Sequence, residues 1–174
     1  MSEQDRIKTF REYMKDCWMP KDFIDWLIEQ GFFSAPASIH HHGCYEGALF
    51  DHSLQVARNL EWLTEKLDLE WEREESPRIV GMFHDLCKVG NYVKGDEAWE
   101  YNNAPLLTGH GEKSVIILQQ YMVITMDELL CIRWHMGAFD DSKNWNSYGL
   151  AVSACPNVLY THVADMKAAR IDGV

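Results

Sequence analysis

Four histidines and two aspartates are the residues of this sequence whose types and spacing favour metal chemistry. Successive histidines are separated by about the length of one helix and one loop, so each can come from a different helix and point into one central space, as in the metal sites of helical bundles. Imidazole and carboxylate ligands together suit Zn, Mn, Fe and similar divalent ions. The six candidate ligands are His52, His84, Asp85, His110, His135 and Asp165.

Both aspartates lie in surroundings that do not suit a charged side chain. Asp85 directly precedes Leu86, and Asp165 directly precedes Met166, each within an otherwise apolar run. A buried carboxylate is unfavourable unless it is paired or bound to a metal. A single helical histidine is more often a surface or core residue than a ligand. Four of them matched with two such carboxylates nevertheless predict a shared metal site.

The elements that must carry these residues are helices along nearly the whole chain. Apolar residues recur at helical spacing in two stripes before residue 31 and across residues 51–67, 76–86, 110–121 and 125–137. Ser76-Pro77 is a typical helix start, and Thr125-x-x-Glu128 forms a capping box. We therefore expect an all-α domain of about seven or eight helices.

Two segments depart from the helical pattern. Residues 92–101 hold a tight turn between aromatic-rich arms, which favours a short β-hairpin. Residues 138–147 are polar and rich in turn formers, so we expect a loop there. The last helix is expected to start at Pro156. Its apolar residues are Leu159, Val163 and Met166.

Length and charge limit the classes of protein to which the chain can belong. With 174 residues, 47% of them hydrophobic, residues 1–174 are expected to form one domain around one core. The 16 Lys and Arg against 27 Asp and Glu give a net charge of −11. Such a surface repels phosphate backbones, which argues against a partner that is a long nucleic-acid duplex. A small anionic substrate remains compatible where a metal or a local Lys or Arg supplies positive charge.

The apolar runs of the sequence indicate the cellular location of the protein, and the spacing of its cysteines indicates whether they form disulfides. No run approaches the roughly 20 apolar residues that span a bilayer, and the first residues lack a signal-peptide pattern, so we expect a cytoplasmic protein without a membrane partner. The five cysteines are widely spaced and include no C-x-x-C pair, which predicts free, mostly buried thiols.

The order of the six candidate ligands resembles the H…HD…H…H…D signature of the HD-domain superfamily of metal-dependent phosphohydrolases. Local sequences are similar as well: residues 52–57 resemble its H-[ST]-L-x-V-A helix, residues 83–90 its H-D-[IL]-x-K-x-G element, and residues 161–166 its closing x-H-x-A-D stretch. The resemblance covers residues 40–170 and implies a single HD-domain helical bundle. Residues 1–35 are then N-terminal helices outside it.

The resemblance implies the two-metal form of this site. The first ion is then held by His52, His84, Asp85 and Asp165. Asp85 also bridges to the second ion, which His110 and His135 complete. The implied cofactors are two divalent metal ions, drawn from Mn, Fe, Zn, Ni or Mg, and the implied reaction is attack of a metal-activated water on phosphorus.

Asp85 and Lys88 are the expected catalytic residues. Lys88 follows Asp85 by three residues and His84 by four, which places it on the same helical face. Because the family motif has a lysine at this position, we interpret Lys88 as a contact to a phosphate oxygen of the substrate. The alternative is a cation that only stabilises a helix C-terminus.

Further substrate contacts are expected from the approach to the first histidine and from a later loop. His41 and His42 lie in a segment similar to the approach of HD-type exoribonucleases, and that segment leads directly to His52. Glu46 lies at a distance from His52 where some relatives place a carboxylate. Trp145 could stack on a base.

The resemblance favours a phosphohydrolase that acts on a nucleotide, a cyclic nucleotide or a short oligonucleotide. One alternative is a diiron oxygenase on the same scaffold, and another is a metal-stabilised interaction module without turnover. No segment specifies a base, a sugar or an oligomeric state. The expected partner is therefore a small phosphorylated, nucleotide-like substrate.

Overall fold

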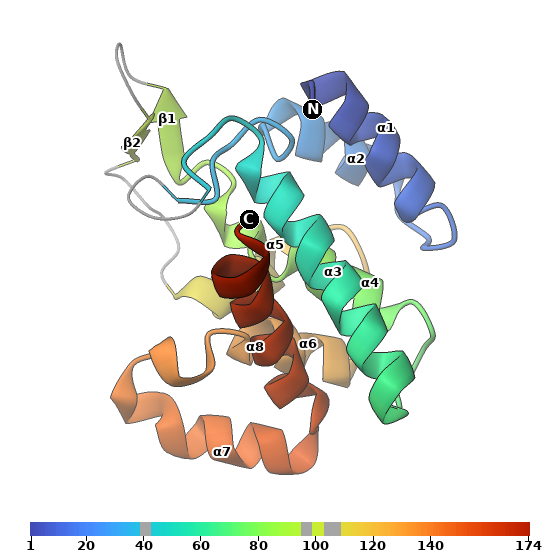
Figure 1. Cartoon of the computed structure of the whole chain (residues 1–174), viewed down its shortest axis with the longest axis vertical. Coiled ribbons are helices and arrows are strands. Elements are labelled where there is room, and N and C mark those ends of the chain that lie inside the picture. Colours follow the sequence, from blue (N-terminus) through green and yellow to red (C-terminus); the bar gives the residue numbers. More distant parts are fainter. Residues whose placement is uncertain (39–42, 95–98, 103–108) are drawn as a thin grey trace.

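The computed structural model of this chain describes residues 1–38, 43–94, 99–102 and 109–174. Within these ranges the fold consists of eight α-helices and one pair of short strands, so the predicted all-α class is confirmed (Figure 1). The helices are α1 (Glu3–Tyr13), α2 (Lys21–Glu29), α3 (Ala48–Leu67), α4 (Ser76–Phe83), α5 (His110–Gln119), α6 (Met126–Trp134), α7 (Trp145–Ala154) and α8 (Asn157–Lys167).

Shorter elements join these helices. Strands β1 (Tyr92–Lys94) and β2 (Trp99–Tyr101) pair antiparallel with Tyr92 opposite Tyr101, as expected for a hairpin, and the residues between the strands lie outside the described ranges. The 3₁₀ turns are η1 (Leu86–Lys88), η2 (Gly137–Phe139) and η3 (Ser142–Asn144), and the π-helical turn is η4 (Ala168–Asp172). Because η2, η3 and the start of α7 occupy residues 138–147, the loop predicted there is wrong.

The capping box predicted at Thr125 is present at the start of α6. The Thr125 side chain accepts a hydrogen bond from the Glu128 backbone N–H, and the Glu128 carboxylate accepts one from the Thr125 backbone N–H at 2.9 Å. These bonds satisfy backbone donors that the first turn of a helix leaves unpaired. Pro77 stands in the first turn of α4, where its missing N–H does no harm.

The packing of α4 against α3 is close because Gly81 has no side chain. A Cβ atom at Gly81 would lie 2.2 Å from the Cα of Ala57, so the two helix backbones are in direct contact there. This contact places the end of α4 beside the first half of α3. As a result, the imidazole rings of His84 and His52 lie with their centroids 5.3 Å apart.

Helices α1 and α2, from the region outside the predicted family match, brace the helices that carry candidate ligands. Phe10 and Phe23 are fully buried, and their ring centroids lie 6.3 and 5.2 Å from that of Phe83, the residue before His84. The buried Arg6 guanidinium donates two hydrogen bonds to the Asp51 carboxylate, at 3.1 and 3.0 Å. The first two helices therefore support both α3 and the end of α4.

The inward face of α8 is not the one that its apolar residues Leu159 and Val163 mark in the sequence. Leu159 and Val163 are 42% and 43% exposed, whereas Val158 and Thr161 are fully buried. Residues four and seven positions before Asp165 share its face of a helix. Because Asp165 points inward, Val158 and Thr161 point inward with it and Leu159 and Val163 turn outward.

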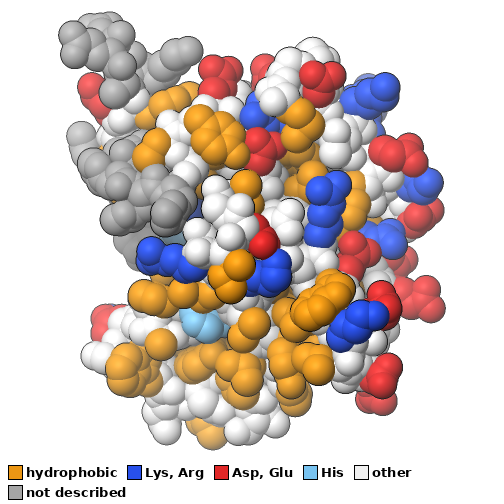
Figure 2. Space-filling model, viewed as in Figure 1, with side chains coloured by type: hydrophobic (Ala, Val, Ile, Leu, Met, Phe, Trp, Pro, Cys, Tyr) orange, Lys and Arg blue, Asp and Glu red, His pale blue; other side chains and the backbone are white. Residues whose placement is uncertain are grey.

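Helix α7 lies at the edge of the bundle and is largely exposed. Trp145 and Leu150 are 54% and 64% exposed, and Figure 2 shows hydrophobic side chains gathered over the lower part of this face, where α7 runs. Among the described helices there is none with the length and apolar content needed to cross a bilayer. All five cysteines are free thiols and all but Cys44 are buried, as predicted.

Candidate metal centre

The fold brings all six sequence-predicted ligands into one cluster. They come from α3 (His52), the residues that follow α4 (His84 and Asp85), the start of α5 (His110), the residue after α6 (His135) and α8 (Asp165). Ligand atoms within 4.8 Å of one another form three overlapping groups in the described part of the chain. These groups are His52, His84 and Asp85; His84, His135 and Asp165; and Asp85, His110 and His135.

The end of α4 explains how two adjacent residues can face one site. Neighbouring residues on a regular α-helix point in different directions. The helix ends at Phe83, Asp85 leaves helical geometry with φ −101° and ψ 20°, and a 3₁₀ turn follows. The helix expected through residue 86 is therefore interrupted, and the interruption turns the Asp85 carboxylate back to 3.5 Å from His84 Nε2.

Glycines beside His110 bring α5 against α6. Gly109 adopts a positive φ of 83° just before the helix, and a Cβ atom at Gly111 would lie 2.1 Å from the Arg133 carbonyl oxygen. The first turn of α5 therefore touches the last turn of α6. This contact places the rings of His110 and His135 with their centroids 5.5 Å apart.

The Asp85 carboxylate divides the four imidazoles into two pairs. Its Oδ1 atom lies 2.9 Å from His110 Nε2 and 3.5 Å from His135 Nε2. Its Oδ2 atom lies 3.5 Å from His84 Nε2 and 3.8 Å from His52 Nε2. One carboxylate therefore presents each of its oxygens to a different pair of imidazoles, which is the arrangement that a bridging ligand requires.

Asp165 belongs to only one of these pairs. Its Oδ1 atom lies 3.1 Å from His52 Nε2 and 3.9 Å from His84 Nε2. Burial alone would raise the pKa of Asp165, but the contact with His52 and the nearby His84 lower it to about 2. This carboxylate is therefore charged near neutral pH and faces the same space as Asp85 Oδ2.

The two most buried imidazoles are oriented as metal ligands. His84 Nδ1 lies 2.8 Å from the Gly81 carbonyl and His135 Nδ1 lies 2.7 Å from the Ile132 carbonyl. A carbonyl only accepts hydrogen bonds, so each Nδ1 carries the proton, and a neutral ring then has its lone pair on Nε2. Both Nε2 atoms are buried without a hydrogen-bond partner among the described residues. Such lone pairs suit a cation, so this donor set fits a metal centre.

The other rings are held by contacts that the sequence did not reveal. His52 Nδ1 lies 3.0 Å from the Val174 carbonyl, and His110 Nδ1 lies 3.4 Å from Cys87 Sγ. His162, three residues before Asp165, donates from Nδ1 to the His135 carbonyl at 2.8 Å. These contacts depend on residues brought together by the fold, so no local sequence signal marks them.

Lys88 lies beside Asp85, as its spacing predicts, although a 3₁₀ turn rather than an α-helix makes the contact. Its Nζ atom is 2.6 Å from Asp85 Oδ2, and its side chain is 18% exposed. Burial alone would raise the pKa of Asp85, but Lys88 and the surrounding imidazoles lower it well below its usual value. Burial would lower the pKa of His110, but Asp85 and Cys87 raise it to about 10.

A cavity of about 580 Å³ opens beside the cluster. Five of the predicted site residues line it: His52, Asp85, Lys88, His110 and Asp165. The rest of its wall includes Tyr92, Tyr101, Met136, Phe139, Met166 and Arg170. Sequence reasoning missed these wall residues because aromatic and apolar side chains in loops and helix ends carry no pattern that distinguishes a cavity from a core.

Two of the predicted substrate contacts, Glu46 and Trp145, are not among the described residues that line this cavity. Glu46 is exposed on the segment before α3, and Trp145 donates from Nε1 to the Asp140 carbonyl at 3.3 Å. Neither residue lines the cavity beside Asp85 within the part of the chain that is described, so their predicted contact with a substrate there finds no support. His41 and His42 lie outside the described residues.

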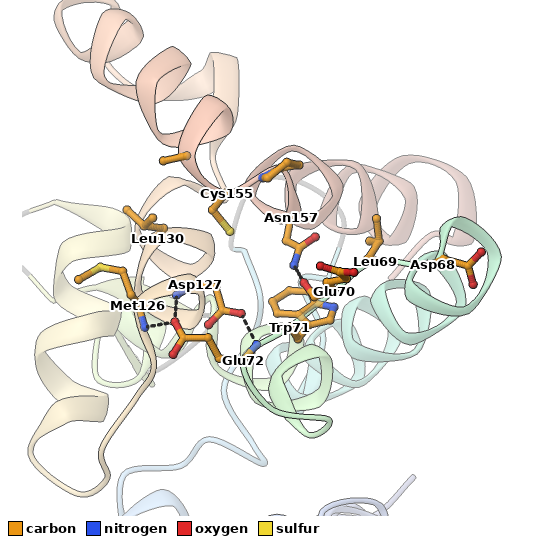
Figure 3. A pocket seen from close by; sticks show the side chains of 12 residues that line it. Asp68, Leu69, Glu70, Trp71, Glu72, Met126, Asp127, Leu130, Cys155 and Asn157 are labelled. Atoms are coloured by element: carbon orange, nitrogen blue, oxygen red, sulfur yellow. Dashed lines mark hydrogen bonds between the residues drawn. The ribbon is translucent and has the colours of Figure 1, made fainter.

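Another cavity, of about 680 Å³, lies between the segment after α3 and the start of α6 (Figure 3). The Glu72 carboxylate accepts hydrogen bonds from the backbone N–H groups of Met126 and Asp127, at 3.1 and 3.4 Å. Asn157 donates to the Glu70 carbonyl at 2.7 Å. The polar groups of this cavity thus join α6 and α8 to the segment after α3. None of the six candidate ligands is among the described residues that line it.

The family model of the HD domain matches residues 49–169, which include all six residues of the cluster. No curated protein matches the chain, and no solved structure does.

Proposed function

The chain belongs to the HD-domain family, whose members are typically metal-dependent phosphohydrolases, and we propose that it hydrolyses a phosphomonoester or phosphodiester with two divalent metal ions. The observation that carries this proposal is the position of Asp85 between two pairs of imidazoles, with Oδ1 facing one pair and Oδ2 the other. A site for a single ion would need only one of these pairs.

The proposed ligands follow from these distances. The first ion would be held by His52, His84, Asp165 and Asp85 Oδ2. The second ion would be held by His110, His135 and Asp85 Oδ1. Four imidazoles favour Mn, Fe, Ni or Zn over Mg, which prefers oxygen ligands. When bound, two such ions supply a water of lowered pKa and positive charge that stabilises the phosphate group.

The residues of the chain bind and orient the substrate around this centre. Lys88 lines the cavity and lies 2.6 Å from Asp85 Oδ2, so its ammonium group can reach a phosphate in the cavity as well as this carboxylate. The backbone carbonyls of Gly81 and Ile132 hold the rings of His84 and His135 in one orientation. Catalysis then requires no covalent nucleophile from the protein.

The cavity supports a substrate of nucleotide size. A volume of about 580 Å³ is within the usual range for small-molecule sites, roughly 300–1,000 Å³. Tyr92, Tyr101 and Phe139 line the wall and offer aromatic faces to a base or sugar. The net charge of −11 opposes a long duplex, so we propose a nucleotide, a cyclic nucleotide or a short oligonucleotide.

The experiment is a metal assay followed by a substrate screen. The purified protein is analysed for bound metals, then tested on nucleotides, cyclic nucleotides and short oligonucleotides with Mn²⁺, Ni²⁺, Zn²⁺ and Mg²⁺. We expect phosphate-ester cleavage that is lost in Asp85→Asn and retained in Asp25→Asn, which changes an exposed aspartate on α2. Oxygen consumption with bound iron and without ester cleavage would instead indicate a diiron oxygenase. Metal binding without either activity would indicate an interaction module.

A further inference from the structure

Arg170 lines the same cavity as Asp85 and Lys88 but comes from a different part of the fold. It lies in η4, the π-helical turn that follows α8, and its side chain is exposed. Within the described ranges, Arg170 makes no hydrogen bond or ion pair. In a protein of net charge −11, a guanidinium without a partner at the edge of a cavity is available to an anion.

The acid closest to Arg170 in sequence is committed to other partners. The Asp172 carboxylate accepts hydrogen bonds from Lys167 Nζ at 2.7 and 2.8 Å and from Asn59 Nδ2 at 2.9 Å. Asp172 therefore pairs with Lys167 and not with Arg170. Lys167, for the same reason, is not an unpaired cation of this turn.

The turn that carries Arg170 is fixed relative to the metal cluster. Asp172 bonds to Asn59 on α3, as described above, and the Val174 backbone N–H donates to the Ala168 carbonyl at 3.2 Å. The Val174 carbonyl in turn accepts from Nδ1 of His52 at 3.0 Å. Figure 1 shows this end of the chain beside α3. π-Helical turns such as η4 occur often at functional sites.

Two cations of different exposure, Lys88 and Arg170, therefore line the cavity together with aromatic and apolar side chains. Lys88 is the inner cation, 18% exposed and in contact with Asp85. Arg170 is the outer, exposed cation. Tyr92, Phe139 and Met166 belong to the wall that both cations share. This lining suits a molecule with one phosphate beside the metals, a flat ring against the aromatic and apolar residues and a second, more exposed anionic group.

We propose that Arg170 binds a second phosphate of the substrate, one that is not cleaved. The substrate class is then a nucleotide with two separate phosphates, such as a nucleoside bisphosphate or a short oligonucleotide with a terminal phosphate. The planar guanidinium can donate two parallel hydrogen bonds to such a group. This inference rests on the proposed phosphohydrolase function, because that function places the reacting phosphate beside Asp85.

The test compares matched substrates that differ by one phosphate. The pairs are 5′-AMP with adenosine 3′,5′-bisphosphate, and the dinucleotide ApA with its 5′-phosphorylated form pApA. Each compound is assayed with Mn²⁺ on the wild-type protein and on Arg170→Gln and Arg170→Lys. Arg11→Gln is the control, because Arg11 is likewise exposed but lies on α1 and does not line the cavity. KM and kcat are measured where a compound is cleaved, and Kd by calorimetry where it is not.

We expect Arg170→Gln to raise KM or Kd about 10–100-fold for the member with the extra phosphate, the range for losing a hydrogen-bonded charge. The kcat of Arg170→Gln should stay within about twofold of the wild-type kcat. Its KM or Kd for the member without the extra phosphate should also stay within about twofold of the wild-type value. For the member with the extra phosphate, Arg170→Lys should have a KM or Kd between those of the wild type and Arg170→Gln. Lysine keeps the positive charge but lacks the planar guanidinium group. Arg11→Gln should match the wild type.

Two results would overturn the inference. One is a wild-type protein that does not prefer the member with the extra phosphate. The other is an Arg170→Gln protein whose preference is unchanged, or whose two values rise equally. A failure of the proposed function can be distinguished from a failure of this inference. If no ester is cleaved with any metal, but calorimetry shows tighter binding of the compound with the extra phosphate and loss of that preference in Arg170→Gln, the Arg170 site is supported and the hydrolytic function is refuted.

Discussion

A Cβ atom at Gly81 would lie 2.2 Å from the Cα of Ala57, so α4 rests directly on the backbone of α3. This contact sets the separation of α3, which carries His52, from α4, which ends one residue before His84. A larger residue at position 81 must push these helices apart, and the imidazoles of His52 and His84 must separate with them.

Gly81→Ala should therefore lower both stability and metal binding. We expect a loss of about 1–3 kcal/mol in the free energy of unfolding, the usual range for overpacking, and weaker binding of the first ion. Urea unfolding and metal analysis measure the two effects. Gly149→Ala is the control: no heavy atom lies within 4 Å of a Cβ there, and alanine in α7 should stabilise by up to about 1 kcal/mol. Wild-type stability and metal content in Gly81→Ala would contradict the proposed contact.

The two aspartates of the cluster should differ in how many ions they hold. Asp85→Asn should abolish binding of both ions, because each of its oxygens faces a different pair of imidazoles. Asp165→Asn should remove only the ion near His52 and His84. Activity should fall more than about 100-fold in both variants, given the dependence of such reactions on their metals. Metal-to-protein ratios after dialysis distinguish the two, and equal ratios would refute the bridging role.

Added metal should stabilise the fold, because it pairs buried nitrogen atoms of His84 and His135 that have no partner among the described residues. A cation at about 100 times its Kd contributes about 2.7 kcal/mol, which raises the Tm of a protein of this size by about 5–11 °C. Scanning calorimetry with Mn²⁺ and with EDTA measures this shift. His135→Ala should show a smaller shift than the wild type, and an identical shift would count against the second site.

The buried pair between Arg6 and Asp51 should be important for stability. Their side chains are only 5% and 15% exposed, and removal of one partner leaves the other charge uncompensated. Arg6→Ala should therefore cost about 3–5 kcal/mol in the free energy of unfolding. The exposed Arg11, changed to Ala, should alter stability by no more than about 0.5 kcal/mol. A small effect of Arg6→Ala in urea unfolding would show that α1 is not anchored through this pair.

Asp140 should make stability depend on acid. Burial alone would raise the pKa of Asp140, but hydrogen bonds from Arg133 and Asn144 outweigh it and lower that pKa. A carboxylate with a lowered pKa in the folded state stabilises the fold above its unfolded pKa of about 3.9, and this stabilisation is lost as the pH falls through the folded value. Asp140→Asn should thus be less stable than the wild type at pH 7. Urea unfolding should show the difference shrinking below about pH 4, and a constant difference would contradict it.

Much of the helix pattern could be predicted because local signals decide it. Thr125 with Glu128 caps α6, and Pro77 lies in the first turn of α4, as the sequence indicates. The face of α8 could not be read from hydrophobicity, since the inward direction is set by Asp165 and its partners on other helices. Helix α7 was missed for a related reason: it is largely exposed, so no apolar stripe distinguishes its polar first residues from a loop.

The six candidate ligands could be found because carboxylates and imidazoles at helix spacing are unusual in apolar segments. Their partners could not, because each depends on a contact across the fold. Cys87 lies against His110, and the Val174 carbonyl lies against His52. Arg170 was missed for the same reason: an arginine near the end of a helix is ordinary until the cavity beside it is known.

The aromatic contacts of Phe83 limit how far this domain can be trimmed. A fragment cut to residues 49–169 would keep all six ligands and lose Phe10 and Phe23, the rings that cover Phe83. Water would then reach the residue joined directly to His84. Such a minimal fragment would retain the six ligands but not the packing that holds them rigid. The first two helices therefore belong in any reconstruction or graft of this site.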